Sequence, residues 1–87
     1  MYKVSSEQQE RIANASYVAS YLAQKGFTVY CDFYKYRVEV DIHTDTYNET
    51  LQAIEAMKGR TDLYMSREIQ PKRLDDGRRW YCIIYKF

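Results

Sequence analysis

The apolar positions of residues 27–42 change parity partway along, and this change predicts a β-hairpin. Residues 27–33 have apolar side chains at odd positions, whereas residues 36–42 have them at even positions. Successive side chains of a strand point to opposite faces of a sheet, so each run is expected to be a strand with one apolar face. Two such runs joined by the short link Tyr34-Lys35 are typical of an antiparallel hairpin.

The same parity predicts a register for this hairpin. We expect Phe33 to pair with Tyr36, which brings the other apolar side chains together on one face and leaves a polar face exposed to solvent. The expected inward pairs are Cys31 with Val38, Val29 with Val40 and Phe27 with Ile42. The expected outward residues are Thr28, Tyr30, Asp32 and Tyr34, facing Arg37, Glu39 and Asp41.

Helical spacing of apolar residues predicts one helix before this hairpin and one after it. The first helix is expected to begin at a Ser5 or Ser6 cap and to end at Gly26. The second is expected to begin at the Thr46 cap and to end at Gly59. The stripes expected to face the sheet are Ile12, Ala15, Val18, Ala19 and Leu22 in the first helix, and Tyr47, Leu51 and Ile54 in the second.

The last third of the chain predicts a second hairpin. Residues 63–69 indicate a strand, which Pro71 confines to a sheet edge or a bulge because proline lacks the N–H that a ladder needs. Asp76-Gly77 is a preferred dipeptide for a tight hairpin turn. Residues 78–87 form a strand that is apolar on both faces, so we expect it inside the sheet or against a partner, and a homodimer is one such arrangement.

Together these elements predict a single α+β domain over residues 1–87. Their order is α-β-β-α-β-β, with two helices packed on one face of an antiparallel sheet, an arrangement that is ferredoxin-like in the broad sense. A short additional strand at residues 2–4 is allowed before the first helix. The hydrophobic fraction of 46% and the charged fraction of 29% are typical of a globular domain. The order of the strands within the sheet is left open.

Composition narrows the classes of function. A formal net charge of +1 argues against binding that is driven by bulk charge, whether to nucleic acid or to an anionic membrane. A core of this size cannot bury ten tyrosines with all hydroxyls paired, so several are expected at the surface. No signal-peptide core or membrane-spanning run occurs, and we expect a cytoplasmic protein. Cys31 and Cys82 are expected to be reduced thiols, with a disulfide between neighbouring strands as the other interpretation.

Few residues in the sequence form patterns typical of metal-binding or catalytic sites. Asp41, His43 and Asp45 alternate, so on a continuing strand they project to one side about 7 Å apart. Metal ligands converge on one point, and no distant cysteine or histidine is expected to complete this trio, so we predict a solvated strand end without a metal or cofactor. Cys31 is expected to point inward, and Cys82 has no histidine close in sequence. Neither a phosphate-binding loop nor a nucleophile elbow occurs, so we do not expect an enzyme.

Binding is the function that these exclusions favour. Tyrosines among alternating charges on the outward face of the first hairpin suit protein recognition. Our hypothesis is a small non-catalytic domain that occupies a larger protein or protein complex through this face or through the Asp76-Gly77 hairpin. Viral and mobile-element accessory proteins that inhibit a host or defence complex often act in this way. The expected anchors are Tyr30, Tyr34, Arg37, Arg78, Arg79 and Trp80.

Residues 67–81 support an alternative, a nucleic-acid-binding domain. Cations stand beside aromatic residues in this segment, and such side chains hold phosphates and stack on bases. Three acidic residues, Glu68, Asp75 and Asp76, lie among the cations and reduce the local positive charge. The residues expected to contact nucleic acid are Lys72, Arg73, Arg78, Arg79, Trp80 and Tyr81.

Overall fold

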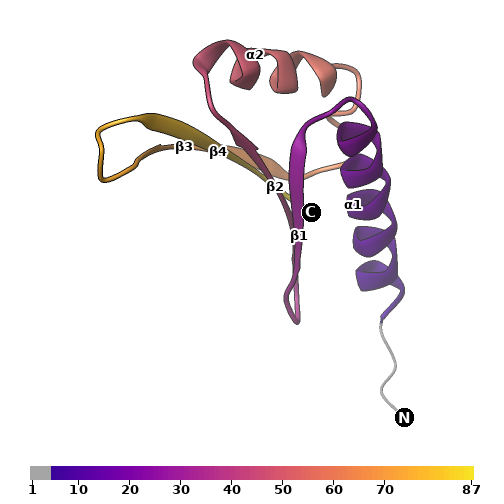
Figure 1. Cartoon of the computed structure of the whole chain (residues 1–87). Coiled ribbons are helices and arrows are strands. Elements are labelled where there is room, and N and C mark those ends of the chain that lie inside the picture. Colours follow the sequence, from indigo (N-terminus) through magenta and orange to yellow (C-terminus); the bar gives the residue numbers. More distant parts are fainter. Residues whose placement is uncertain (1–4) are drawn as a thin grey trace.

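The computed structural model describes residues 5–87, which form an α+β domain with the predicted order α-β-β-α-β-β (Figure 1). The predicted additional strand at residues 2–4 lies outside the described residues. The elements are α1 (Ser6–Gln24), β1 (Thr28–Phe33), β2 (Val38–Thr44), α2 (Tyr47–Ala56), β3 (Ser66–Arg73) and β4 (Arg79–Lys86).

The four strands form one antiparallel sheet in the order β1-β2-β4-β3. Each hairpin pairs with itself, and the two hairpins meet where β2 pairs with β4. This is not the strand order of the classic ferredoxin-like fold, so the predicted resemblance extends only to two helices and a four-stranded antiparallel sheet. Strand β4 has a neighbour on each side, which confirms its expected place inside the sheet.

The first hairpin has the predicted parity, but its register differs from the prediction by two residues. Phe33 pairs with Val38 instead of Tyr36. The turn is formed by Lys35-Tyr36 and is closed where the Tyr34 N–H donates to the Arg37 carbonyl at 2.9 Å. A shift of two residues leaves every side chain on its predicted face, because the side-chain period of a strand is two. The pairs on the helix-covered face are Val29 with Ile42, Cys31 with Val40 and Phe33 with Val38, but Phe33, at the end of β1, is 60% exposed.

The second hairpin has a longer turn than predicted. Its loop is Asp75-Asp76-Gly77, closed where the Leu74 N–H donates to the Arg78 carbonyl at 2.8 Å. Gly77 has φ +87° at the last loop position, where a three-residue hairpin loop needs a left-handed residue. The tip of this hairpin projects beyond both helices (Figure 1). Pro71 lies in β3, which is an edge strand, as its lack of an N–H predicts.

Helix α1 begins and ends as its sequence predicts. The Ser5 hydroxyl accepts a hydrogen bond from the Gln8 N–H at 3.1 Å, which makes Ser5 the N-terminal cap. At the other end Gly26 has φ +95°, and the Phe27 N–H donates to the Leu22 carbonyl at 3.2 Å. This is the Schellman ending that a glycine after the last helical turn favours.

Helix α2 begins after the Thr46 cap and ends before Gly59, but it buries a different face from the one predicted. Of the expected stripe, Ile54 packs against the core as predicted, but Tyr47 and Leu51 do not, because Tyr47 is 60% exposed and Leu51 is 47% exposed. The side chains that this segment buries are Thr50, Ala53 and Met57.

A hydrogen bond explains why a threonine replaces a larger apolar residue on the buried side of α2. The hydroxyl groups of Thr50 and Thr44 lie 2.6 Å apart, and the Thr50 hydroxyl also donates to the Thr46 carbonyl at 3.1 Å. A buried hydroxyl with partners carries little penalty. A pattern of hydrophobic positions does not record such a pair, so it assigned the wrong face.

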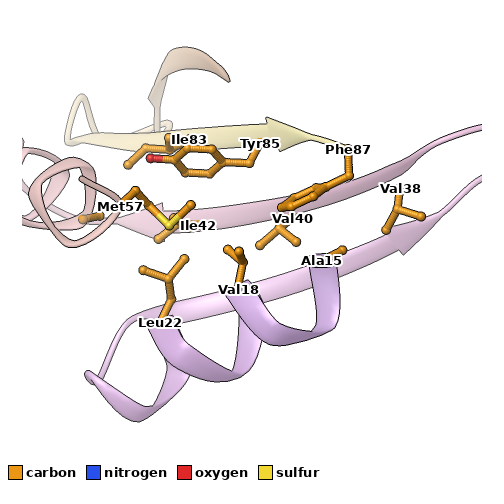
Figure 2. Packing of buried hydrophobic residues seen from close by; sticks show 11 residues of the cluster. Ala15, Val18, Leu22, Val38, Val40, Ile42, Met57, Ile83, Tyr85 and Phe87 are labelled. Carbon is orange, nitrogen blue, oxygen red and sulfur yellow. The ribbon is translucent and has the colours of Figure 1, made fainter. Parts of the chain in front are cut away.

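Both helices pack on the same face of the sheet. Helix α1 lies against β1 and β2, and α2 lies against β2 and β4, so β2 runs through the middle of the packing. Figure 2 shows the side chains of α1 meeting those of β2 and β4 in one apolar layer. The buried cluster is Ala15, Val18, Leu22, Val38, Val40, Ile42, Ala53, Met57, Ile83, Tyr85 and Phe87.

Candidate functional site on the open face of the sheet

The sheet face opposite the two helices is not covered by either of them, and we call it the open face. Side chains alternate between the faces of a strand, so the residues between the buried core positions point to the open face. The centre of the open face holds Tyr30, Asp32, Asp41, His43, Trp80 and Cys82. Tyr30 is 52% exposed, which confirms the prediction that it stays in contact with water.

Three aromatic rings lie in a row across β1, β2 and β4, and we call them the aromatic row. The His43 ring centroid is 4.7 Å from that of Tyr30 and 4.9 Å from that of Trp80. The planes are tilted by 48° and 52°, within the range of favourable ring packing. The imidazole is therefore held between two larger rings at the surface of the sheet.

A polar cluster lies directly beside this row. His43 pairs with Cys82 across β2 and β4, and Asp41 stands two residues before His43 on the same face of β2. One potential ligand atom of each side chain lies within 4.8 Å of those of the other two. The expectation that no distant cysteine joins this strand end is therefore wrong. Asp45, the third member of the predicted trio, is instead exposed in the loop before α2.

The sequence does not assign Cys82 to this cluster, because the residue that lies opposite Cys82 depends on the strand order. The parity of β4 places Cys82 on the same side as Trp80, and that signal is present in the sequence. Only the pairing of β2 with β4, which no local pattern specifies, brings Cys82 beside His43.

Asp41 stands in an acidic and partly buried environment. Burial, followed by the hydrogen bond and negative charge of Asp32, raises the pKa of Asp41 from 3.8 to about 6. A hydrogen bond between two carboxyl groups requires that one of them be protonated. The Asp41 Oδ1 atom is buried and has no hydrogen-bond partner among residues 5–87. The negative charge of an ionised Asp41 is therefore not balanced within the site. Either a bound proton or a cation balances it.

The two cysteines lie in different environments. Cys82 is 6% exposed, and burial, followed by the charge of Asp41, raises the pKa of its thiol. Cys31 pairs with Val40 on the face that carries the helices, and β2 separates its strand from β4. Both thiols are free, and a disulfide between them is excluded by the opposite faces and the intervening strand.

The predicted partner-binding residues are not all in one place. Tyr30 and Trp80 belong to the aromatic row. Tyr34 and Arg37 lie at the β1–β2 turn, whereas Arg78 lies at the β3–β4 turn, at the opposite end of the sheet (Figure 1).

At the β1–β2 turn, Arg37 is engaged within the chain. Its guanidinium lies 4.5 Å from the centroid of the Tyr34 ring, and its Nε lies 2.7 Å from a carboxylate oxygen of Glu39. These contacts order the turn, so a partner that uses Arg37 has to compete with them.

The cations of the β3–β4 hairpin are divided between the two faces of the sheet. Lys72 pairs with Trp80 on the open face, whereas Arg73 pairs with Arg79 with the opposite parity. A hollow of about 350 Å³ lies on this hairpin. It is lined by Pro71, Lys72, Arg73, Arg79 and Tyr81.

A larger groove of about 690 Å³ adjoins the aromatic row, and we call it the tip groove. Arg78 is held by Asp76, with Nε 2.6 Å from a carboxylate oxygen. The side chain of Arg79, in contrast, has no ion pair or side-chain hydrogen bond within the described part of the chain. The groove is lined by His43, Asp45, Leu74, Arg78, Arg79 and Trp80.

Comparisons of the chain with protein-family models, with curated proteins and with solved structures found no match. Neither helix within residues 5–87 has the length and apolarity needed to cross a lipid bilayer. The fold and the open face thus define the class: a small α+β domain whose antiparallel sheet is covered on one side and bare on the other.

Proposed function

We propose that this chain is a small, non-catalytic protein-binding domain that occupies a surface of a larger partner. The observation that carries the proposal is the aromatic row, which lies on an uncovered sheet face next to the tip groove, with Tyr30 exposed and His43 and Trp80 half-buried. Tryptophan, tyrosine and arginine are the residues most enriched among those that dominate binding energy. Here Tyr30, Trp80 and Arg79 occur within one continuous region of the surface.

The tip groove favours a partner segment of particular chemistry. Leu74 and Trp80 supply apolar surface, and Arg79 supplies a positive charge that no described residue pairs. Asp45 is the one acidic residue of the lining. A segment that places an apolar side chain beside a carboxylate complements this lining, because it buries the rings and pairs the free guanidinium.

The polar cluster supports a binding role more than a catalytic one. Nucleophilic cysteines act as thiolates, and the raised pKa of Cys82 keeps its thiol protonated near neutral pH. Across residues 5–87, no hydrogen bond links His43 to a serine, threonine or cysteine as a general base requires.

Affinity capture from cells of the source organism, followed by titration calorimetry with the purified partner, tests the proposal. Tyr30→Ala and Trp80→Ala are expected to weaken binding at least tenfold, in line with the roughly 2 kcal/mol or more that anchor residues contribute. Tyr17→Ala is the matched control, because Tyr17 and Tyr30 are each 52% exposed and Tyr17 lies on α1. Equal affinities for all three variants would exclude the open face as the binding surface.

The hollow on the β3–β4 hairpin favours nucleic-acid binding as a second candidate function. Lys72, Arg73 and Arg79 line the same hollow as Tyr81, and cations near an aromatic ring suit a phosphate backbone with a stacked base. Single- and double-stranded oligonucleotides at low salt are the probes. Binding through phosphates weakens steeply as salt is raised. Absence of any mobility shift with both probes would rule this candidate out.

A further inference from the structure

We propose that the open face binds a divalent transition-metal ion, with Zn²⁺ as the best fit, through Asp41, His43 and Cys82. This proposal does not require the proposed protein-binding function, because the metal ligands are argued from their own geometry and chemistry. Two ligands come from alternate positions of β2 and the third from the directly opposed position of β4.

The backbone already brings the three groups within reach of one ion. Their potential ligand atoms lie within 4.8 Å of one another. Tetrahedral zinc, with bonds of about 2.0–2.3 Å, separates its ligand atoms by roughly 3.3–3.8 Å. Small side-chain rotations therefore bring the three ligand atoms to the spacing that zinc needs. The strands do not have to move, because their pairing fixes the three Cα positions.

The donor atoms select the class of metal. An imidazole nitrogen, a thiolate sulfur and a carboxylate oxygen are the three ligand types that zinc accepts in proteins. Ca²⁺ and Mg²⁺ prefer sites made only of oxygen, so the histidine and the cysteine disfavour them. Three protein ligands leave a fourth position for water, or for the carboxyl group of Asp32, which already contacts Asp41.

Unbalanced charge at Asp41 is a second, independent observation that points to a cation. Two acidic side chains of the open face are paired, Glu39 with Arg37 at 2.7 Å and Glu68 with Lys86 at 3.3 Å, whereas Asp32, which contacts Asp41, adds a further negative charge there. Asp41 has no ion pair within residues 5–87, and its buried Oδ1 has no hydrogen-bond donor. A bound metal ion supplies the missing positive charge at this atom.

The aromatic row prepares His43 for this role. Tyr30 and Trp80 pack against the imidazole from two sides, at centroid distances of 4.7 and 4.9 Å. A ligand whose ring is already held loses less conformational entropy when the metal binds.

Titration calorimetry of the chelator-treated, tag-free chain with Zn²⁺ is the direct test. We expect one ion per chain, and Co²⁺ as a spectroscopic probe is expected to show the thiolate charge-transfer band of a cysteine ligand. Cys82→Ser and His43→Ala are each expected to weaken Zn²⁺ binding at least tenfold. A tenfold loss of metal affinity is already the lower end of the range for residues that only hydrogen-bond to a ligand. Cys31→Ser is the matched control, because its thiol lies on the opposite face, and it is expected to bind as the wild type does.

A second measurement needs no substitution at a metal ligand, so it remains valid if a ligand variant fails to fold. In the Cys31→Ser background only the Cys82 thiol remains, and Zn²⁺ is expected to slow its alkylation by iodoacetamide. The proposal is overturned if Zn²⁺ does not bind the wild-type chain, if Cys82→Ser binds it with undiminished affinity, or if Zn²⁺ leaves the alkylation rate of Cys82 unchanged.

Discussion

His43 and Cys82 face each other across β2 and β4, on the side of the sheet that no helix covers. The pairing joins the two hairpins of the chain at one point of the open face. Through it, Asp41 in the middle of β2 lies near the Cys82 thiol, and the His43 imidazole packs against the ring of Trp80 at a centroid distance of 4.9 Å. Both proposals therefore depend on the same junction between the hairpins.

Neighbouring isoleucines of β4 test which face is covered. Ile83 is fully buried under the helices, whereas Ile84 is half-buried on the open face. We expect Ile83→Ala to lower the free energy of unfolding by about 3–4 kcal/mol, and Ile84→Ala by about 1 kcal/mol, because only the first leaves a cavity in the core. Denaturant unfolding of both variants measures the difference. Equal losses would contradict the assigned faces.

The Thr44–Thr50 hydrogen bond is expected to behave as a coupled pair. Thr50→Val leaves the Thr44 hydroxyl buried without its partner, so we expect a loss of about 1–3 kcal/mol in the free energy of unfolding. The double variant Thr44→Val/Thr50→Val removes both groups and is expected to recover part of that loss. Chemical unfolding of the two single variants and the double variant gives the interaction energy of the two hydroxyl groups as a double-mutant cycle. Additive losses would show that the two hydroxyls do not interact.

Gly77 is expected to matter for its backbone conformation alone. It has φ +87°, and an added Cβ would meet no atom within 4 Å. We expect Gly77→Ala to cost about 1 kcal/mol, the penalty for an L-residue in the left-handed region. Asp75→Ala in the same loop is the control and is expected to change stability by much less. Thermal unfolding compares them, and equal stability of the two variants would contradict the loop conformation.

Metal-free protein is expected to gain stability from Asp41 as the pH falls. The pKa of Asp41 is about 6 in the fold against 3.8 as its ordinary value, so between these values the folded state binds the proton more tightly. Its contribution is most favourable below the ordinary value and is lost as the pH rises through about 6. Asp41→Asn is therefore expected to be more stable than the wild type at pH 7 by roughly 1–2 kcal/mol, after allowance for partial exposure to solvent.

The measurement for Asp41 is the difference in unfolding free energy between Asp41→Asn and the wild type, taken from pH 4 to pH 7 with a chelator present. The difference removes the titration of groups that both proteins share. We expect it to grow as the pH rises, and a difference that is independent of pH would contradict the raised pKa.

Local patterns predicted the number, type and order of the helices and strands within residues 5–87, because caps, parity and turn residues act over a few positions. Ser5, Gly26 and the alternation in β1 and β2 are examples. The third strand was placed too early, at residues 63–69, whereas β3 spans Ser66–Arg73. The register of the first hairpin was two residues off, since parity is unchanged by such a shift.

Features that depend on contacts between distant segments were not predictable. The buried face of α2 is set by a threonine pair, and the order of β2 and β4 is set by how the two hairpins dock. The aromatic row and the Asp41–His43–Cys82 cluster follow from that docking. The alternation along residues 41–45 indicates Asp41 and His43, but no local pattern places Cys82 beside them.

An engineered disulfide tests the central pairing most directly. In the Cys31→Ser background, the His43→Cys substitution is expected to form a bond with Cys82 under mild oxidation, because directly opposed residues have the Cα separation that a disulfide needs. Thr28→Cys is the control, because it pairs with His43 from the other side and so lies two strands from Cys82, about 9–10 Å away. Mass spectrometry of the non-reduced chain is predicted to find the bond in the first variant alone. Failure to form it, or equal formation in the control, would contradict the open face as described.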